Sequence, residues 1–87
     1  MNTNFLPDTQ LANYIKSQLS NISVARGWAS SSEVAYVLGV AERTIIRWRS
    51  KSLKEQKKVG VTCYHIGNQY RYFLSDIYQY YLDNIVA

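Results

Sequence analysis

The sequence predicts a mainly helical domain with one small β-hairpin. In the first half of the chain, apolar residues recur every three or four positions, which is the period of an amphipathic helix. After residue 60, apolar and polar residues alternate around a Gly-Asn pair, as in a hairpin. A period of four returns near the C-terminus and predicts a closing helix. A length of 87 residues suits one small domain.

The first predicted helix follows Pro7, and its apolar stripe consists of Leu11, Ile15, Leu19 and Ile22. We therefore divide the chain into residues 1–29, a lead and an amphipathic helix, and residues 30–87, which carry the remaining elements. Such a stripe usually packs on its own domain. The alternative is a homodimer contact through this N-terminal helix.

A capping box marks the start of the next helix. Ser30 and Glu33 have the spacing at which the serine and the glutamate satisfy each other's backbone N–H groups. We expect this helix to end at Gly39, because glycine adopts a positive φ at low cost. The residues expected in the core are Val34, Ala35, Leu38 and Val40.

Another helix is predicted over residues 42–50. Ile45 and Trp48, three residues apart, face inward, and Trp48 anchors the helix on its neighbours. The side chains expected to face outward are Glu42, Arg43, Ile46 and Arg47. A short helix, a glycine turn and a second helix with outward arginines form the layout of a helix-turn-helix, whose second helix enters the DNA major groove.

Residues 61–73 predict the hairpin, with Gly67-Asn68 as its turn. In the closing helix Ser75 is the expected N-cap. The inner face of that helix is expected to consist of Ile77, Tyr81 and Ile85. A hairpin at this place suits a wing that lies along the DNA backbone or in the minor groove. The fold class is therefore a winged helix-turn-helix with an extra N-terminal helix.

Basic residues are concentrated in one segment. Between Arg43 and Lys58, seven basic residues stand against one acidic residue, Glu55, so this segment carries +6 whereas the whole chain carries +4. A segment of this kind attracts polyanions and releases counterions when it binds them. The alternative is a solvated, lysine-rich loop that only keeps the chain soluble.

The candidate DNA contacts come from the second helix of the motif, the connector after it and the hairpin. Arg43 and Arg47, four residues apart, share one helix face, and the arginine fork matches the O6 and N7 acceptors of guanine. Arg71 is the candidate phosphate contact on the hairpin. The complete set is Arg43, Thr44, Ile46, Arg47, Arg49, Lys51, Lys54, Lys57, Lys58, Asn68, Gln69 and Arg71.

Other chemistry has little support in the sequence. Cys63 and His65 are the only cysteine and histidine, and a zinc site usually takes four such ligands. In a strand the two residues lie about 6–7 Å apart, too far for a nucleophile and its base. We therefore expect no metal, no cofactor and no enzyme activity. One cysteine and the lack of an apolar run near about 20 residues favour a cytoplasmic protein, associated with the nucleoid when bound to DNA.

Residues 30–82 resemble the excisionase-like, MerR-type winged helix-turn-helix DNA-binding domains. The matching stretches are SSEVAYVLGV, RTIIRW and IGNQYRYFLSDIYQYYL. Tyr72 and Asp76 fit the family's aromatic residue four positions before the Asp that opens the helix after the wing. Ala41 departs from the family, which usually has a Ser or Thr N-cap at that position. The lysine-rich connector, residues 50–60, also lacks the usual proline before the wing.

The resemblance implies a protein that binds double-stranded DNA, with Arg43 and Arg47 in the major groove and Arg71 on the wing. Family members include excisionases of phages and mobile elements, which bend DNA and direct an integrase in DNA recombination, and small regulators of transcription. The expected partners are therefore double-stranded DNA and an integrase or the transcription machinery. The competing hypothesis is a protein–protein interaction adaptor on the same scaffold.

Overall fold

The computed structural model describes residues 8–84 and confirms a mainly helical fold with a small antiparallel sheet. The strands of the sheet lie in the order β1-β3-β2, and β2 and β3 form the predicted hairpin. In chain order the elements are α1 (Asp8–Gln18), α2 (Asn21–Arg26), β1 (Trp28–Ala29), α3 (Ser31–Leu38), α4 (Glu42–Glu55), β2 (Tyr64–Ile66), β3 (Gln69–Phe73) and α5 (Leu74–Asp83).

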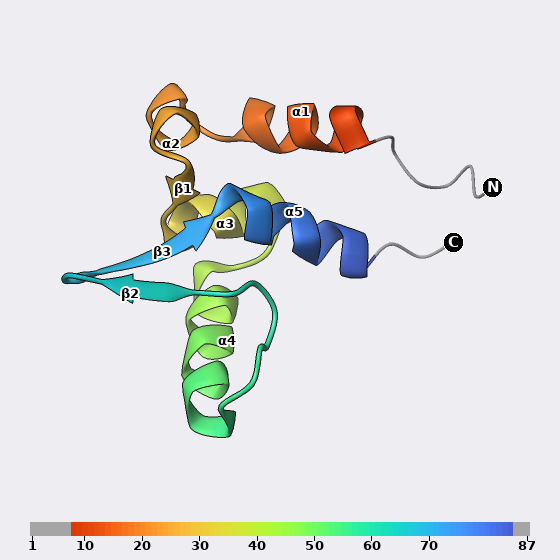
Figure 1. The fold of residues 1–87 in the computed structure, drawn as a ribbon. Coiled ribbons are helices and arrows are strands. Elements are labelled where there is room, and N and C mark those ends of the chain that lie inside the picture. The colour runs from red at the N-terminus through yellow and green to blue at the C-terminus, as the bar shows by residue number, and fades with distance from the viewer. Residues whose placement is uncertain (1–7, 85–87) are drawn as a thin grey trace.

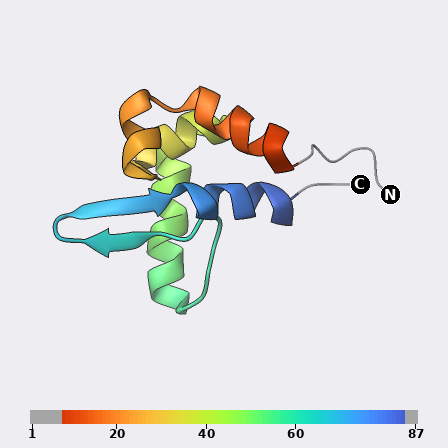
Figure 2. The same ribbon diagram turned by 45° about the horizontal axis from the view of Figure 1, so that its top comes forward.

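Helices α1, α3 and α5 lie together, whereas α4 extends away from them (Figure 1). Helix α1 packs against both α3 and α5. The hairpin crosses α4, and its turn projects beyond that helix (Figure 2). Helix α4 and the hairpin therefore form the part of the described chain that reaches farthest from α1. None of the described helices is long and apolar enough to cross a membrane.

One apolar core joins the described elements, and the N-terminal stripe belongs to it. Three of the four stripe residues are buried, and each packs within the same cluster as α3, α4 and α5. The buried apolar residues are Leu11, Ile15, Leu19, Ala29, Val34, Ala35, Val37, Ile45, Val61, Tyr72 and Ile77.

The prediction that Ile22 continues the stripe was wrong. Ser20 caps a separate helix, α2, because its Oγ accepts a hydrogen bond from the Ser23 N–H at 3.2 Å. The break turns the chain, so Ile22 is 70% exposed and Ser23 is buried. Gly27 then ends α2 with a φ of +83°.

The capping box at the start of α3 is confirmed. The Ser30 N–H donates to Glu33 Oε1 at 2.8 Å, and the Glu33 N–H donates to Ser30 Oγ at 3.3 Å. Gly39 ends the helix with a φ of +71°, as predicted.

The inner face of α3 differs in part from the prediction. Val34 and Ala35 are buried as expected, but Val37 is buried and Leu38 only half-buried. Val40 is 38% exposed and does not re-enter the core. Its N–H bonds to the Ala35 carbonyl at 3.0 Å, which completes the end of the helix and keeps Val40 at the surface.

Helix α4 is longer than predicted, because it continues to Glu55 and takes in half of the expected connector. The added residues are mostly good helix formers, and Lys51 pairs with Glu55 four positions later. The helix ends at Gln56, which has a φ of +53°. Ile45 is fully buried as predicted, whereas Trp48 is half-buried and packs on Tyr80, with ring centroids 5.3 Å apart.

The hairpin turns at Gly67-Asn68 as predicted, with Gly67 at a φ of +62°. Its first strand is shorter than predicted: pairing with β3 begins at Tyr64, so residues 61–63, including Cys63, lie outside the strands. A further strand, β1, is absent from the sequence prediction; it pairs with β3 so that Trp28 lies opposite Phe73.

The start of α5 was also mispredicted. The helix begins at Leu74, whose N–H bonds to the Gly27 carbonyl at 3.1 Å, and Phe73 occupies the N-cap position without a side-chain hydrogen bond. Ser75 therefore lies inside the first turn and is not the cap. Ile77 is buried and Tyr81 half-buried on the inner face, and Ile85 lies outside the described residues.

Candidate nucleic-acid interface

The outward face of α4 carries three exposed cations, Arg43, Arg47 and Lys54. At 3.6 residues per turn these positions fall within about 40° of one another around the helix. None of the three makes an ion pair within residues 8–84. Ile46, 39% exposed, lies beside them. The face can therefore present unpaired guanidinium and ammonium groups to a polyanion.

The remaining lysines of the predicted basic segment form solvent-exposed ion pairs with acidic neighbours. Lys51 Nζ and Lys57 Nζ lie 3.9 Å and 3.3 Å from the carboxylate oxygens of Glu55. Lys58 Nζ lies 3.2 Å from Asp83 Oδ2, and hydrogen bonds from Gln79 and Lys58 lower the pKa of Asp83. The basic segment therefore divides into an open face on α4 and a group of ion-paired lysines.

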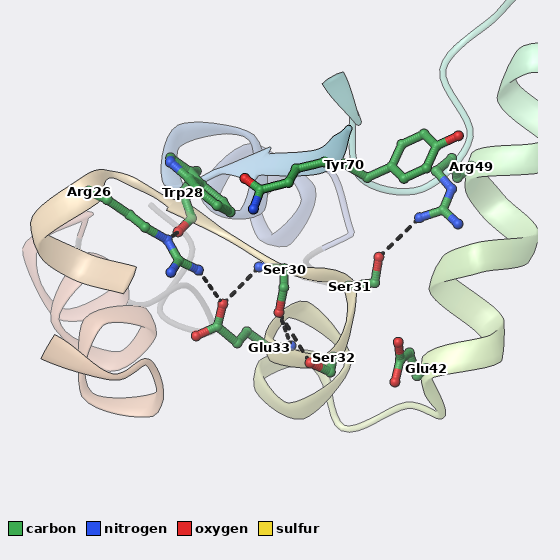
Figure 3. A pocket seen from close by; sticks show the side chains of 10 residues that line it. Arg26, Trp28, Ser30, Ser31, Ser32, Glu33, Glu42, Arg49 and Tyr70 are labelled. Atoms are coloured by element: carbon green, nitrogen blue, oxygen red, sulfur yellow. Dashed lines mark hydrogen bonds and ion pairs between the residues drawn. The ribbon is translucent and has the colours of Figure 1, made fainter. Parts of the chain in front are cut away.

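Arg49 joins α4 to two other elements and does not lie with Arg43 and Arg47. Its guanidinium carbon lies 3.7 Å from the centre of the Tyr70 ring. Its Nη1 donates to Ser31 Oγ at 3.1 Å, at the start of α3 (Figure 3). The side chain is half-buried. Arg49 is therefore placed to fix how α4 sits against α3 and the hairpin.

The start of α4 lacks a side-chain cap. Ala41 occupies the N-cap position, and no side-chain hydrogen bond is made there, because alanine has no side-chain acceptor. Glu42 in the first turn favours the helix dipole. Thr44 is half-buried, and its N–H bonds to the Ala41 carbonyl at 2.9 Å. Thr44 is thus partly withdrawn from the exposed face.

The hairpin exposes its first strand, β2, and the residues of its turn, whereas most of β3 is buried or half-buried. Asn68 and Gln69 are exposed. Arg71 is half-buried, and its guanidinium carbon lies 4.5 Å from the centre of the Trp28 ring. The Nε of Arg71 is buried and has no hydrogen-bond partner among the described residues. Since side chains alternate along a strand, Arg71 lies on the sheet face opposite the buried Tyr72.

A hollow of about 640 Å³ lies between the start of α3, α4 and the hairpin (Figure 3). Two cations line it, Arg26 and Arg49, and two carboxylates balance them, Glu33 and Glu42. Arg26 Nη2 lies 2.7 Å from Glu33 Oε1, and the Arg26 guanidinium stacks 3.8 Å from the centre of the Trp28 ring. The charges that line this hollow therefore sum to zero, and one of its cations, Arg26, is paired with one of its carboxylates, Glu33.

Glu33 is the centre of that network. Burial opposes its ionisation, but hydrogen bonds from Ser23 and Ser30 and the charge of Arg26 outweigh burial and lower the pKa of Glu33. The carboxylate thus connects α2 to the start of α3 and has a structural part beyond the capping box.

Sequence reasoning missed Arg26, Trp28 and Tyr70. The apolar pair Trp28-Ala29, set between Gly27 and the capping box, was a signal for a short strand. Tyr70 lies within the predicted hairpin, residues 61–73, but its contact with Arg49 depends on how the hairpin crosses α4.

The described residues form neither a metal site nor an activated nucleophile. Residues 8–84 contain no group of three or more His, Cys, Asp or Glu side chains that could hold a metal ion. Burial raises the pKa of the Cys63 thiol, which disfavours the reactive thiolate. Comparisons of the chain with protein-family models, with curated proteins and with solved structures find no match.

Proposed function

We propose that the chain is a sequence-specific protein for double-stranded DNA that binds in the manner of a winged helix-turn-helix. The observation that carries the proposal is the exposed set of Arg43, Arg47 and Lys54 on one face of α4, without ion pairs among the described residues. Helices α3 and α4 then act as the two helices of the motif. The β2–β3 hairpin acts as the wing.

In this arrangement Arg43 and Arg47 read base edges in the major groove, where arginine pairs best with guanine. Lys54 contacts phosphate farther along α4. Asn68 and Gln69 at the hairpin turn contact the backbone or the minor groove. Arg49 supports these contacts from behind, because its Nη1 donates to Ser31 and its guanidinium stacks on Tyr70.

The resemblance to excisionase-like, MerR-type domains supports two biological roles for such a protein. One is an architectural factor in DNA recombination that works with an integrase, and the other is a small regulator of transcription. Neither role needs a catalytic residue or a cofactor.

The test is duplex binding by fluorescence anisotropy, with random-sequence and host-derived duplexes across a salt series. Affinity is expected to fall with salt, with a slope of about −0.9 in log units per phosphate contacted. Arg47→Ala should weaken binding to the preferred duplex more than to random duplex. The matched control is Lys51→Ala, which removes an exposed charge already paired with Glu55 and should leave the preference unchanged.

Two results bear against the proposal. Equal losses on both duplexes for Arg47→Ala mean that Arg47 contacts phosphate only, and the claim of sequence reading fails at this residue. No binding to any duplex at about 50 mM salt, where non-specific attraction is strong, overturns DNA binding altogether. That outcome favours an adaptor with a protein partner.

A further inference from the structure

A second hollow lies between the C-terminal half of α4 and the hairpin, and residues 57–63 close one side of it; these elements are seen in Figure 2. Its volume is about 350 Å³. This falls in the range of small-molecule pockets, roughly 300–1,000 Å³. The hollow is separate from the one at the start of α3, although Arg49 and Tyr70 border both.

The lining of this hollow offers apolar and aromatic surface. Leu53 of α4 is 69% exposed there, although it is one of the larger apolar side chains of the domain. On the hairpin side, the rings of His65 and Tyr70 stack with centroids 4.4 Å apart and planes 15° apart. Cys63 adds a half-buried sulfur beside them. An apolar body placed in the hollow would cover Leu53 and lie near this ring pair.

The charges of the hollow are of one sign. Arg49, Lys57 and Lys58 line it, and no carboxylate does, unlike the first hollow with its two glutamates. The C-terminal end of α4 opposes an anion with roughly half an elementary charge, which is less than the three cations supply. The ion pairs of Lys57 and Lys58 are exposed, so these lysines can turn to a new anion at low cost.

The segment that carries Lys57 and Lys58 is hydrogen-bonded to α4. Ser52 Oγ accepts a hydrogen bond from the Val59 N–H at 3.0 Å and donates to the Val59 carbonyl at 3.3 Å. The N–H groups of Gln56 and Lys57 both bond to the Ser52 carbonyl. These bonds hold the start of the connecting segment against the helix and keep its two lysines beside the hollow.

We propose that this hollow binds a small organic anion with an aromatic or apolar body. The body covers Leu53 and lies along the His65–Tyr70 pair, and the acid group meets Arg49, Lys57 and Lys58. Five residues at about 100° each place Lys54 about 140° around α4 from Arg49, so the hollow is distinct from the open basic face. The inference therefore does not rest on DNA binding.

The test is a titration of the ¹⁵N-labelled full chain with 2-naphthoate, followed by two-dimensional NMR. Saturable shifts are expected at the amides of Leu53, Gln56, Thr62 and His65. The uncharged analogue 2-naphthylmethanol should bind more weakly, because it lacks the acid group. Shifts centred on Arg43, Arg47 and Lys54 overturn the proposal, as does the lack of saturable shifts.

Three variants sharpen the test. Leu53→Ser removes exposed apolar surface and should weaken 2-naphthoate binding about tenfold. Lys58→Gln should weaken it severalfold, whereas the matched control Lys54→Gln removes the same charge outside the hollow and should change little. Equal effects of the two glutamine variants overturn the proposal. A duplex that shifts the hollow's own amides and displaces 2-naphthoate overturns it in favour of DNA as the occupant.

Discussion

The guanidinium carbon of Arg49 lies 3.7 Å from the centre of the Tyr70 ring and joins α4 to β3. The same side chain donates to Ser31 Oγ at the start of α3. One residue therefore connects three elements, α4, α3 and β3. A planar guanidinium can make both contacts, because its face stacks on the Tyr70 ring while an N–H at its edge donates a hydrogen bond to Ser31.

Arg49→Lys is expected to lower the free energy of unfolding by about 1–2 kcal/mol, because lysine keeps the charge but loses the stacked fork and its lateral hydrogen bond. Urea denaturation measures the change. The matched control, Arg47→Lys, lies on the open face and should change stability by less than about 0.5 kcal/mol. Equal stability of the two variants contradicts the joining role of Arg49.

Gly60→Ala is expected to lower the free energy of unfolding by about 2–5 kcal/mol, since steric overlap adds to backbone strain. A Cβ at Gly60 would lie 2.2 Å from Trp48 Cε3, and the residue has a φ of +69°. Thermal unfolding followed by circular dichroism measures the loss. Gly67→Ala is the control: its φ is +62°, but nothing lies within 4 Å of the added atom. Similar losses in both variants mean that Trp48 yields to the methyl group.

The lowered pKa of Glu33 predicts a pH dependence of stability. A carboxyl whose folded pKa is depressed contributes stability that is present above its unfolded pKa and is lost as pH falls through the folded pKa. Stability should therefore fall below about pH 4.5, and Glu33→Gln should flatten that acid limb. Urea unfolding at a series of pH values tests this.

Asp76 is the control, because its contribution to stability should change with pH in the opposite direction to that of Glu33. Burial raises the pKa of Asp76, although the charge of Lys58 partly offsets it. Its contribution is present at low pH and is lost as pH rises through the folded pKa. Asp76→Asn should therefore stabilise the protein at neutral pH relative to acid pH. Parallel pH profiles of the Glu33 and Asp76 variants would contradict both assignments.

Tyr81→Phe is expected to cost about 0.5–1.5 kcal/mol of stability, because the Tyr81 hydroxyl donates to the Val37 carbonyl at 3.0 Å. Burial, with the neighbouring Tyr14, raises the pKa of Tyr81 to about 12, so this hydrogen bond persists until the pH approaches that value. Chemical denaturation measures the cost. Tyr36→Phe, at a side chain that is 70% exposed, should have no effect.

Elements set by short-range signals could be predicted, and those set by long-range contacts could not. The capping box of Ser30 and the glycine turns at Gly39 and Gly67 depend on neighbours a few residues away, so α3 and the hairpin were recognised. Strand β1 has only two residues and exists because β3 offers it an edge. Helix α2 depends on one serine cap that was read as part of the first helix.

The same distinction applies to the candidate interface. The shared face of Arg43 and Arg47 follows from their spacing, because helix geometry fixes it. The pairing of Lys58 with Asp83 and the contact of Arg49 with Tyr70 join residues distant in sequence. No spacing rule reveals such contacts. The sequence therefore predicts one continuous basic segment, whereas the fold divides it into unpaired cations on α4 and ion-paired lysines.

Strand β1 also has a consequence for how the chain folds. Phe73 follows Trp28 by 45 residues, and the two stand opposite each other in the sheet. The helices can form from nearby residues, but the sheet is complete only after most of the chain has been brought back on itself. Because closing so long a loop costs entropy before the contacts form, we expect sheet assembly to limit the rate of folding. A fragment that begins at residue 30 would leave β3 with an unpaired edge, the kind of edge along which strands of separate chains associate.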